Sequence, residues 1–257
     1  QSGIFNQALA NHRVYYTFHG TSAHASQSPH LGRSALDACE LMNVGVNYLR
    51  EHMIDEARVH YAYTDAGGTA PNIIPSKSED ARLLRERVDD IARGAALMTG
   101  TSVDIETACV YDSFLPNPVL DQLVLKYLKL YTPVHSPGEE AYARDFLSYG
   151  NLPEADRAFD DIPDLSITRK TGISTDVGNV SQILPCTAFM VCCYANGSPL
   201  HHWTVTAQGK SSAAHKGMLA AGKILSSCAL ELLTEPGLLL QVQKAFHKAK
   251  GIYTAAP

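Results

Sequence analysis

The sequence has few charged residues and lacks the patterns of nucleic-acid-binding, membrane and secreted proteins. Charged side chains make up 18% of the 257 residues, and 26 acidic against 21 basic residues give a formal net charge of −5. Lys and Arg form no cluster dense enough for a nucleic-acid surface. No apolar run approaches the roughly 20 residues of a membrane-spanning helix, and the first residues do not resemble a signal peptide. We therefore expect a soluble globular protein with neither a nucleic-acid nor a membrane partner.

Cysteine pairing of the kind used for metals or disulfides is also missing. The six cysteines contain no Cys-x-x-Cys pair and lie mostly in apolar stretches. Cys192 and Cys193 are adjacent in an expected strand, where neighbouring side chains point to opposite faces, which argues against a metal clamp or a disulfide. Reduced, buried thiols fit this pattern. They predict a cytoplasmic protein.

What is present over residues 1–116 is a pattern of alternating strands and helices. Residues 12–20 alternate apolar and polar side chains, which is typical of a half-buried strand. Further strands are expected at 57–63 and 102–106, and helices at 34–52 and 76–100. The last of these helices opens with the capping box Ser76-x-x-Glu79. This order predicts an α/β fold that begins with a ferredoxin-like split βαβ domain.

A second domain is expected over residues 117–257. Its expected helices are 119–131, 139–147, 211–233 and a last one from Pro236. Residues 187–194 form a nearly continuous apolar run, as in a strand buried on both faces. The helix–strand–helix order indicates part of an α/β sheet domain.

Candidate functional residues lie at the ends of these elements. An expected strand ends in Gly20, and a turn of small residues then presents His24. Asn72 lies between two prolines that restrict the backbone around it. Two later loops contain the remaining candidates, which are Asp176, Asn179, His201 and His202.

Taken in order, these segments resemble a known enzyme family. The segments are Phe18-x-Gly-x-x-x-His24, Pro71-Asn-x-x-Pro75 and Pro199-Leu-His201. They resemble the second half of the two-metal amidohydrolase and metallopeptidase family, which includes aminoacylases and carboxypeptidase G, and within it the p-aminobenzoyl-glutamate hydrolase branch. The resemblance implies a lid or dimerisation domain over 1–116 and the C-terminal half of the metal-dependent hydrolase domain over 117–257. The implied reaction is hydrolysis of an amide that links an acyl or aroyl group to an amino acid.

By that resemblance the lid is short of one strand. The family has a strand carrying an arginine between the Asn-x-x-Pro turn and the second helix, whereas only residues 76–80 lie there in this chain. Arg82 and Arg85 follow in helical context, so we expect both to face the solvent rather than to replace that arginine.

The resemblance also implies roles for four of the candidates. His24 would reach into the active site of the neighbouring subunit and stabilise the oxyanion there. Asn72 would contact the substrate, and Asp176 and Asn179 would border it. From the residues alone, His24 and Asn72 fit ordinary turn positions equally, and Asp176 fits a helix cap or turn.

Metal binding is implied only in part. The family uses two divalent metal ions, zinc or manganese, and the resemblance gives His201 as one ligand, with His202 competing for that role. A lone histidine in a polar loop is more often a surface residue. The chain contains no His-x-Asp, and Glu139-Glu140 is expected to begin a solvated helix rather than to bind metal. We therefore expect an incomplete copy of the enzyme that is inactive alone.

The sequence also offers two alternatives to this function. Ser174 lies in Gly172-Ile-Ser-Thr-Asp176, which is similar to the Gly-x-Ser-x-Gly nucleophile elbow of a serine hydrolase. Asp176 replaces the second glycine of that motif, which argues against this function. The alternative to an enzyme is a non-catalytic dimerisation or interaction subunit that lends His24 to an active site on another chain. The partners expected are a small-molecule amide substrate and either a second copy bound through the lid or a related subunit.

Overall fold

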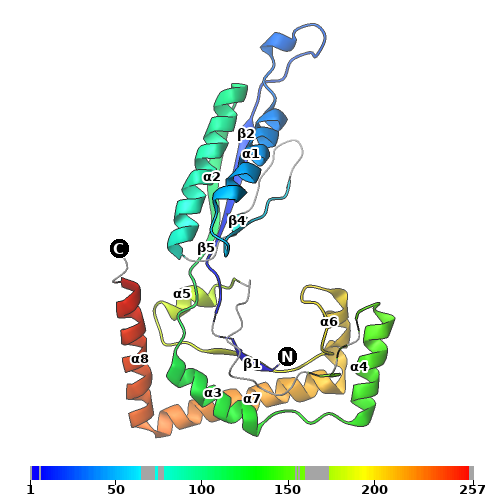
Figure 1. Ribbon diagram of the computed structural model, residues 1–257, viewed down its shortest axis with the longest axis vertical. Helices are drawn as coiled ribbons and strands as arrows, with labels where there is room; N and C mark the ends of the chain where they lie inside the picture. Colours follow the sequence, from blue (N-terminus) through cyan, green and yellow to red (C-terminus); the bar gives the residue numbers. More distant parts are fainter. Residues whose placement is uncertain are drawn as a thin grey trace. The chain divides into compact units, whose positions relative to one another are not determined.

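The computed structural model describes residues 2–5, 7–64, 73–74, 78–153, 155, 157–159 and 174–254. The chain divides into two compact units (Figure 1). The first, here called the sheet unit, comprises residues 8–114 and 171–182. The second, the helical unit, comprises residues 1–7, 115–170 and 183–257. Short segments from each of the expected domains therefore belong to the other unit.

The sheet unit is built on a four-stranded antiparallel sheet in the order β3–β4–β2–β5. Its long strands are β2 (Asn11–His19) and β5 (Ser102–Tyr111), and its short ones are β3 (Arg58–Val59) and β4 (Ile73–Ile74). β2 and β5 pair along the whole of β2, with a register shift between Arg13 and Val14. The alternation expected for β2 is confirmed, because Val14, Tyr16 and Phe18 are buried in the core.

Two helices cover the core of this unit (Figure 1). They are α1 (Ala35–Leu49) and α2 (Ser78–Thr99). Ser34 caps α1 by accepting a hydrogen bond from the Asp37 N–H. The helices approach closely at Gly45, where a Cβ would lie 2.6 Å from Cγ2 of Ile91. Single-turn 3-10 helices at Pro29–Leu31 and Arg50–His52 flank α1.

The order of strands and helices is that of a ferredoxin-like domain. Its fourth strand lies inside the Asn-x-x-Pro segment, and not after it, where the family has its arginine-bearing strand. Ile73 and Ile74, expected in a turn, form β4 between β3 and β2. The capping box expected at Ser76 lies outside the described residues.

Arg82 and Arg85 have different environments, so the expectation for Arg85 is wrong. Arg82 pairs with Glu86 on the exposed side of α2. The Arg85 side chain is only 23% exposed and pairs with Asp89 at 3.4 Å. The carboxylate of Asp89 in turn accepts a 2.6 Å hydrogen bond from the buried hydroxyl of Tyr16. Burial and this bond raise the pKa of Tyr16, and Arg85 belongs to a polar network within the core.

The helical unit combines a small sheet with five helices in its described residues. Its helices are α3 (Pro118–Leu130), α4 (Pro137–Tyr149), α6 (Trp203–Ala207), α7 (Ser212–Thr234) and α8 (Pro236–Thr254). β1 (Gly3–Phe5) pairs antiparallel with β6 (Ala188–Met190), so the strand expected at 187–194 is only three residues long. The remaining helix, α5 (Val177–Ser181), belongs to the sheet unit. The α/β class predicted from the sequence is confirmed.

The sequence expectation that no segment could span a membrane does not hold for α7. Among the described residues, this one helix is long and apolar enough to do so by length and composition. Core helices of soluble proteins meet the same criterion. In this structure, α7 packs against α3 and α8 around Ile224 and Cys228.

Candidate functional site

His24 lies in a loop whose two ends are held together. Thr21 and Arg33 exchange two backbone hydrogen bonds of 2.8 Å, which close the loop between β2 and α1. Gly20 makes this closure possible, because a Cβ at Gly20 would overlap the Arg33 carbonyl oxygen. His24 itself is exposed. The sequence thus builds a closed arm with a histidine on it.

Local hydrogen bonds determine which ring nitrogen of His24 can donate. Its Nδ1 accepts from the backbone N–H groups of Ser26 (3.3 Å) and Gln27 (3.2 Å). A nitrogen that accepts carries no proton, so the neutral ring holds its proton on Nε2. His24 therefore combines a local turn role with a free N–H donor. These two interpretations of the sequence are compatible.

The closed end of this loop borders a cavity of about 850 Å³. Phe18, Gly20, Thr21, Arg33 and Asp37 are among its lining residues. Ala23 and Ala25 on either side of His24 also line it. A small molecule fits a space of this size.

The other candidates of the sheet unit lie apart from this loop or outside the described residues. Asn72 is outside them. Asn179 on α5 accepts a 2.6 Å hydrogen bond from the Asp112 N–H and donates a 3.1 Å bond to the Val110 carbonyl. Its amide thus ties α5 to the end of β5. Asp176 is exposed before α5, makes no side-chain cap bond and accepts from Thr175 Oγ1. The substrate roles of all three stay predictions.

His201 has an unusual backbone conformation. Its φ is +59°, and among the described non-glycine residues only Asn151 also has a positive φ. This left-handed conformation is uncommon for a side-chain-bearing residue, and it persists where the surroundings enforce it. The side chain is exposed on the turn before α6.

The buried side chain of Gln208 holds this turn through hydrogen bonds to residues on both sides of it. Its Oε1 accepts from the Ala195 N–H at 2.8 Å. Its Nε2 donates to Ser198 Oγ and to the Thr204 carbonyl, both at 3.0 Å. One amide therefore clamps both sides of the His201 turn. Sequence reasoning missed Gln208 because no motif marks it.

We expect Gln208→Leu to lower the free energy of unfolding by about 1–3 kcal/mol, since it leaves the Ala195 N–H and the Ser198 hydroxyl without their buried partner. Urea unfolding of the chain measures this. Thr206→Ala, at an exposed position of the same segment, is the control and should stay within about 0.5 kcal/mol of wild type. Equal stability of Gln208→Leu and wild type would contradict the clamp.

His202 is engaged more firmly than its neighbour. Its Nδ1 lies 2.8 Å from Oγ1 of the fully buried Thr204, and its ring centroid lies 5.7 Å from that of Trp203. Such a bond orients a ring and leaves Nε2 available. Both histidines thus remain candidates for the metal ligand.

The described residues do not fit a metal centre of their own. Nowhere in the described part of the chain do three His, Cys, Asp or Glu side chains come together. A catalytic zinc site uses three protein ligands. If His201 binds metal, the other ligands come from elsewhere.

Glu139 begins α4 as expected, but the expectation that it is solvated is wrong. It forms a capping box with Ser136. Its carboxylate also accepts hydrogen bonds of 2.7 Å from Lys216 Nζ and from Ser212 Oγ, both on α7. The side chain is only 10% exposed. The bond from Lys216, together with those from Ser136 and Ser212, lowers the pKa of Glu139 to about 2.

A pH-dependent contribution to stability follows from Glu139. Because its pKa is lower in the folded chain, its contribution is full above the unfolded pKa near 4.5 and is lost as the pH falls towards 2. Glu139→Gln should therefore have a lower urea midpoint than wild type at pH 7, and the difference should shrink below pH 4.5. Glu140→Gln, at the exposed neighbouring position, is the control. A difference that is independent of pH would contradict this role.

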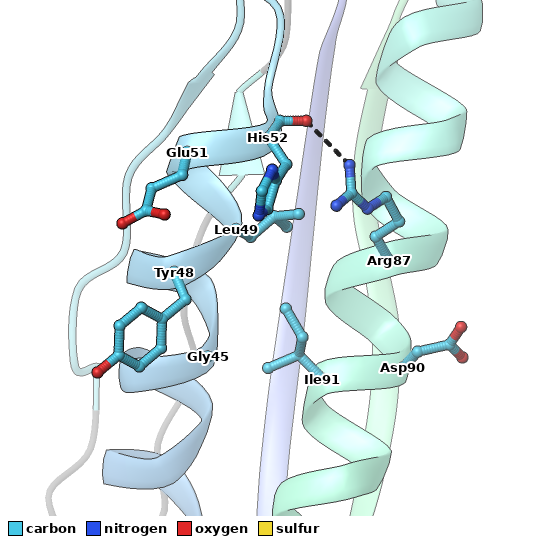
Figure 2. Close-up of a pocket in the computed structure, with 8 residues that line it drawn as sticks. All are labelled: Gly45, Tyr48, Leu49, Glu51, His52, Arg87, Asp90 and Ile91. Carbon is cyan, nitrogen blue, oxygen red and sulfur yellow. Dashed lines mark hydrogen bonds between the residues drawn. The ribbon is translucent and has the colours of Figure 1, made fainter.

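A second cavity, of about 470 Å³, lies between α1 and α2 (Figure 2). Arg87 of α2 donates a 3.0 Å hydrogen bond to the His52 carbonyl beyond the end of α1. Tyr48, Glu51 and Asp90 are among the other lining residues (Figure 2). None of the functional residues predicted from the sequence lines this groove between the two helices.

Comparison with known proteins relates the whole chain to part of several hydrolases. No family model matches the sequence. The chain is 36% identical over 281 aligned residues to one of the subunits of p-aminobenzoyl-glutamate hydrolase from Escherichia coli (strain K12), covering 95% of this chain and 58% of that protein. A mouse Xaa-Arg dipeptidase is 30% identical, with 93% of this chain and 52% of the dipeptidase covered. The chain is homologous to these hydrolases.

The fold has a counterpart among solved structures. A protein assigned as an aminohydrolase from methicillin-resistant Staphylococcus aureus superposes with a TM-score of 0.54 at 12% identity. The match covers 90% of this chain and 54% of that structure. This likeness concerns the fold alone, whereas the sequence relatives confirm the predicted resemblance to hydrolases of this kind. The chain spans about half the length of these curated relatives.

Proposed function

We propose that this chain is the lid and the closing half of an amidohydrolase that cleaves the amide between an acyl or aroyl group and an amino acid. The observation that carries the proposal is the free Nε2 N–H of His24 on an exposed, closed loop. Kinship to a p-aminobenzoyl-glutamate hydrolase and to a dipeptidase supports the substrate class. These relatives are named as a hydrolase of p-aminobenzoyl-glutamate and a dipeptidase.

The chemistry asks for a donor of this kind. When a nucleophile attacks an amide carbonyl, negative charge develops on the carbonyl oxygen, and a preorganised N–H stabilises it most in the transition state. The Nε2 N–H of His24 can donate to this oxygen while Nδ1 accepts from the loop. Because its ring is held only by its own loop, the ring is free to serve an active site on a neighbouring subunit. We propose that the sheet unit forms the contact with this neighbouring subunit, which is either a second copy of the chain or a related subunit.

In this proposal the chain supplies one residue that binds metal. We propose that the complete enzyme uses two divalent ions, zinc or manganese, and that His201 supplies one ligand. Asn72, Asp176 and Asn179 would border the substrate. Lewis-acid activation is the chemistry that such ions supply when bound.

Alone, the chain should neither retain metal in stoichiometric amount nor hydrolyse p-aminobenzoyl-glutamate, an N-acyl amino acid or an Xaa-Arg dipeptide. The reason is that one histidine cannot replace three ligands. Metal analysis after dialysis and a hydrolysis assay test this. A tightly held pair of ions with turnover would show that a complete ligand set lies within these residues.

The second candidate is a non-catalytic subunit that lends His24 to another chain. It is favoured by the Escherichia coli relative, which is named as one subunit of a hydrolase. Sedimentation tests this candidate, because it shows whether the chain is a monomer or associates with itself or with a related subunit. A chain that neither self-associates nor binds a related subunit would contradict this candidate.

A further inference from the structure

Trp203 is the only tryptophan of the chain, and it begins α6 directly after the two histidines that are candidates for the metal ligand. It is 52% exposed. Tryptophan is highly buried on average in folded proteins, because it carries a large apolar ring system. An exposed indole beside a candidate site is therefore a surface that a ligand can use.

Aromatic neighbours hold this indole in place. The ring of Phe146, on α4, lies 6.0 Å from it at an interplanar angle of 52°, and the ring of His202 lies 5.7 Å from it at 41°. Such tilted pairs are favourable aromatic contacts. Neither ring is parallel to the indole, so among the described residues no stacked partner takes the indole face.

The aromatic surface continues from α6 onto α4, the two helices that lie side by side in Figure 1. Tyr142 is 43% exposed, and its ring lies 5.8 Å from that of Phe146 one turn along the helix. We call Tyr142, Phe146 and Trp203 the aromatic shelf. It offers an apolar, ring-lined surface beside the His201 turn.

The backbone beneath the shelf is fixed by buried groups. The ring of His202 lies 2.8 Å from Oγ1 of Thr204, and the Thr204 carbonyl accepts a 3.0 Å bond from Gln208. Gly150 at the end of α4 allows close approach to α6, because a Cβ there would lie 3.2 Å from Cγ2 of Thr204. A preorganised surface of this kind loses little conformational entropy when a ligand binds.

A flat aromatic ring gains most from such a shelf. Offset stacking on an indole adds to the burial of apolar area, whereas a short aliphatic acyl group contributes only its smaller area. In an aroyl amide the ring is bonded directly to the carbonyl carbon. The Cα atoms of His201 and Trp203 are at most about 7 Å apart, because two residues separate them. A ring on Trp203 therefore brings the amide carbonyl close to the His201 turn.

We propose that Trp203 is the platform on which the acyl side of the substrate stacks, and that it selects aromatic over aliphatic acyl groups. This inference rests on the proposed function and narrows its substrate class to aroyl amides. Trp203 contacts the ring, whereas Phe146 and His202 are positioning residues that keep the indole in place.

The chain alone allows a direct binding test, because Trp203 is its only indole. We expect N-benzoyl-glutamate to quench the indole fluorescence to saturation and N-acetyl-glutamate to leave it unchanged. Saturation-transfer NMR should detect the benzoyl ring protons on wild type and Trp203→Phe, but not on Trp203→Leu. Tyr149→Leu, at an 82% exposed aromatic position of α4 outside the shelf, is the control and should keep the signal.

The whole enzyme tests the selection. Trp203→Leu should lower kcat/KM for N-benzoyl-glutamate roughly tenfold more than for N-acetyl-glutamate, because only the aromatic substrate loses its stacking partner. Trp203→Phe keeps a ring and should change this ratio much less. A merely structural role would slow both substrates equally. Because Trp203 is half-exposed, the urea midpoints of both variants should stay close to wild type.

Two results would overturn the proposal. They are a benzoyl signal that is the same on wild type and Trp203→Leu, and an equal fall of kcat/KM for both substrates in that variant. If the whole enzyme hydrolyses neither compound while the ring still binds, the proposed function fails and the platform stands. Hydrolysis of both compounds with an unchanged ratio in Trp203→Leu would reject the platform and keep the function.

Discussion

Mixing two inactive variants of the whole enzyme, His24→Ala and His201→Ala, should restore roughly a quarter of wild-type activity. Under the proposed mechanism each variant alone lacks a group that the reaction needs, and removing one oxyanion donor typically lowers kcat by roughly 100- to 1,000-fold. In a two-fold dimer with random exchange, half the molecules are mixed, and one of the two sites in each has its own His201 and a donated His24. The rate of hydrolysis after subunit exchange measures the rescue.

The control for this experiment is exchange itself, followed by mass spectrometry of the mixed dimer. If His24 acted within its own subunit, each site of the mixture would lack one group, and activity would stay at the level of the single variants. That result, with exchange demonstrated, would leave His24 as a local loop residue.

Gly20→Ala should lower both the free energy of unfolding and the activity that depends on the His24 donor. Its Cβ would overlap the Arg33 carbonyl oxygen and press on the Ala35 N–H at 2.9 Å. Both neighbours are backbone atoms, so the loop must open or β2 must shift. Overpacking of this kind costs about 1–3 kcal/mol. We expect that loss in urea unfolding, and in the whole enzyme a fall in kcat like that of His24→Ala.

Gly94→Ala is the matched control. Gly94 lies within α2, and a Cβ there meets nothing within 4 Å. Alanine is the better helix former, so this variant should gain about 0.5–1 kcal/mol with unchanged activity. If Gly20→Ala behaved like Gly94→Ala, the closed loop end would have no role in holding His24.

Local sequence pattern predicts the parts of the fold that have many residues per element. The alternation of Val14, Tyr16 and Phe18 predicts β2 because each residue buries one face of a long strand. β4 has only two residues, too few for any periodicity, and it exists because β2 and β3 provide partners on both sides. Its formation is a tertiary effect.

The candidate site divides in the same way. The His24 motif is visible in the sequence, whereas the proton position on its ring depends on backbone N–H groups that only the folded loop supplies. The Arg85–Asp89 pair has helical i,i+4 spacing and could have been found. Lys216 lies far from Glu139 in the chain, so their pairing is known only once α4 and α7 meet.

Because Thr21 and Arg33 close the loop that carries His24, the length of this loop can vary without a change in the strand and helix that support it. Because the two hydrogen bonds isolate residues 22–32 from β2 and α1, insertions there change neither element. Doubling the length of a flexible loop costs only about 0.6 kcal/mol in closure entropy. Under the proposed function, the reach of His24 can therefore change in evolution independently of the rest of the sheet unit, so that the same scaffold can serve active sites of different depth.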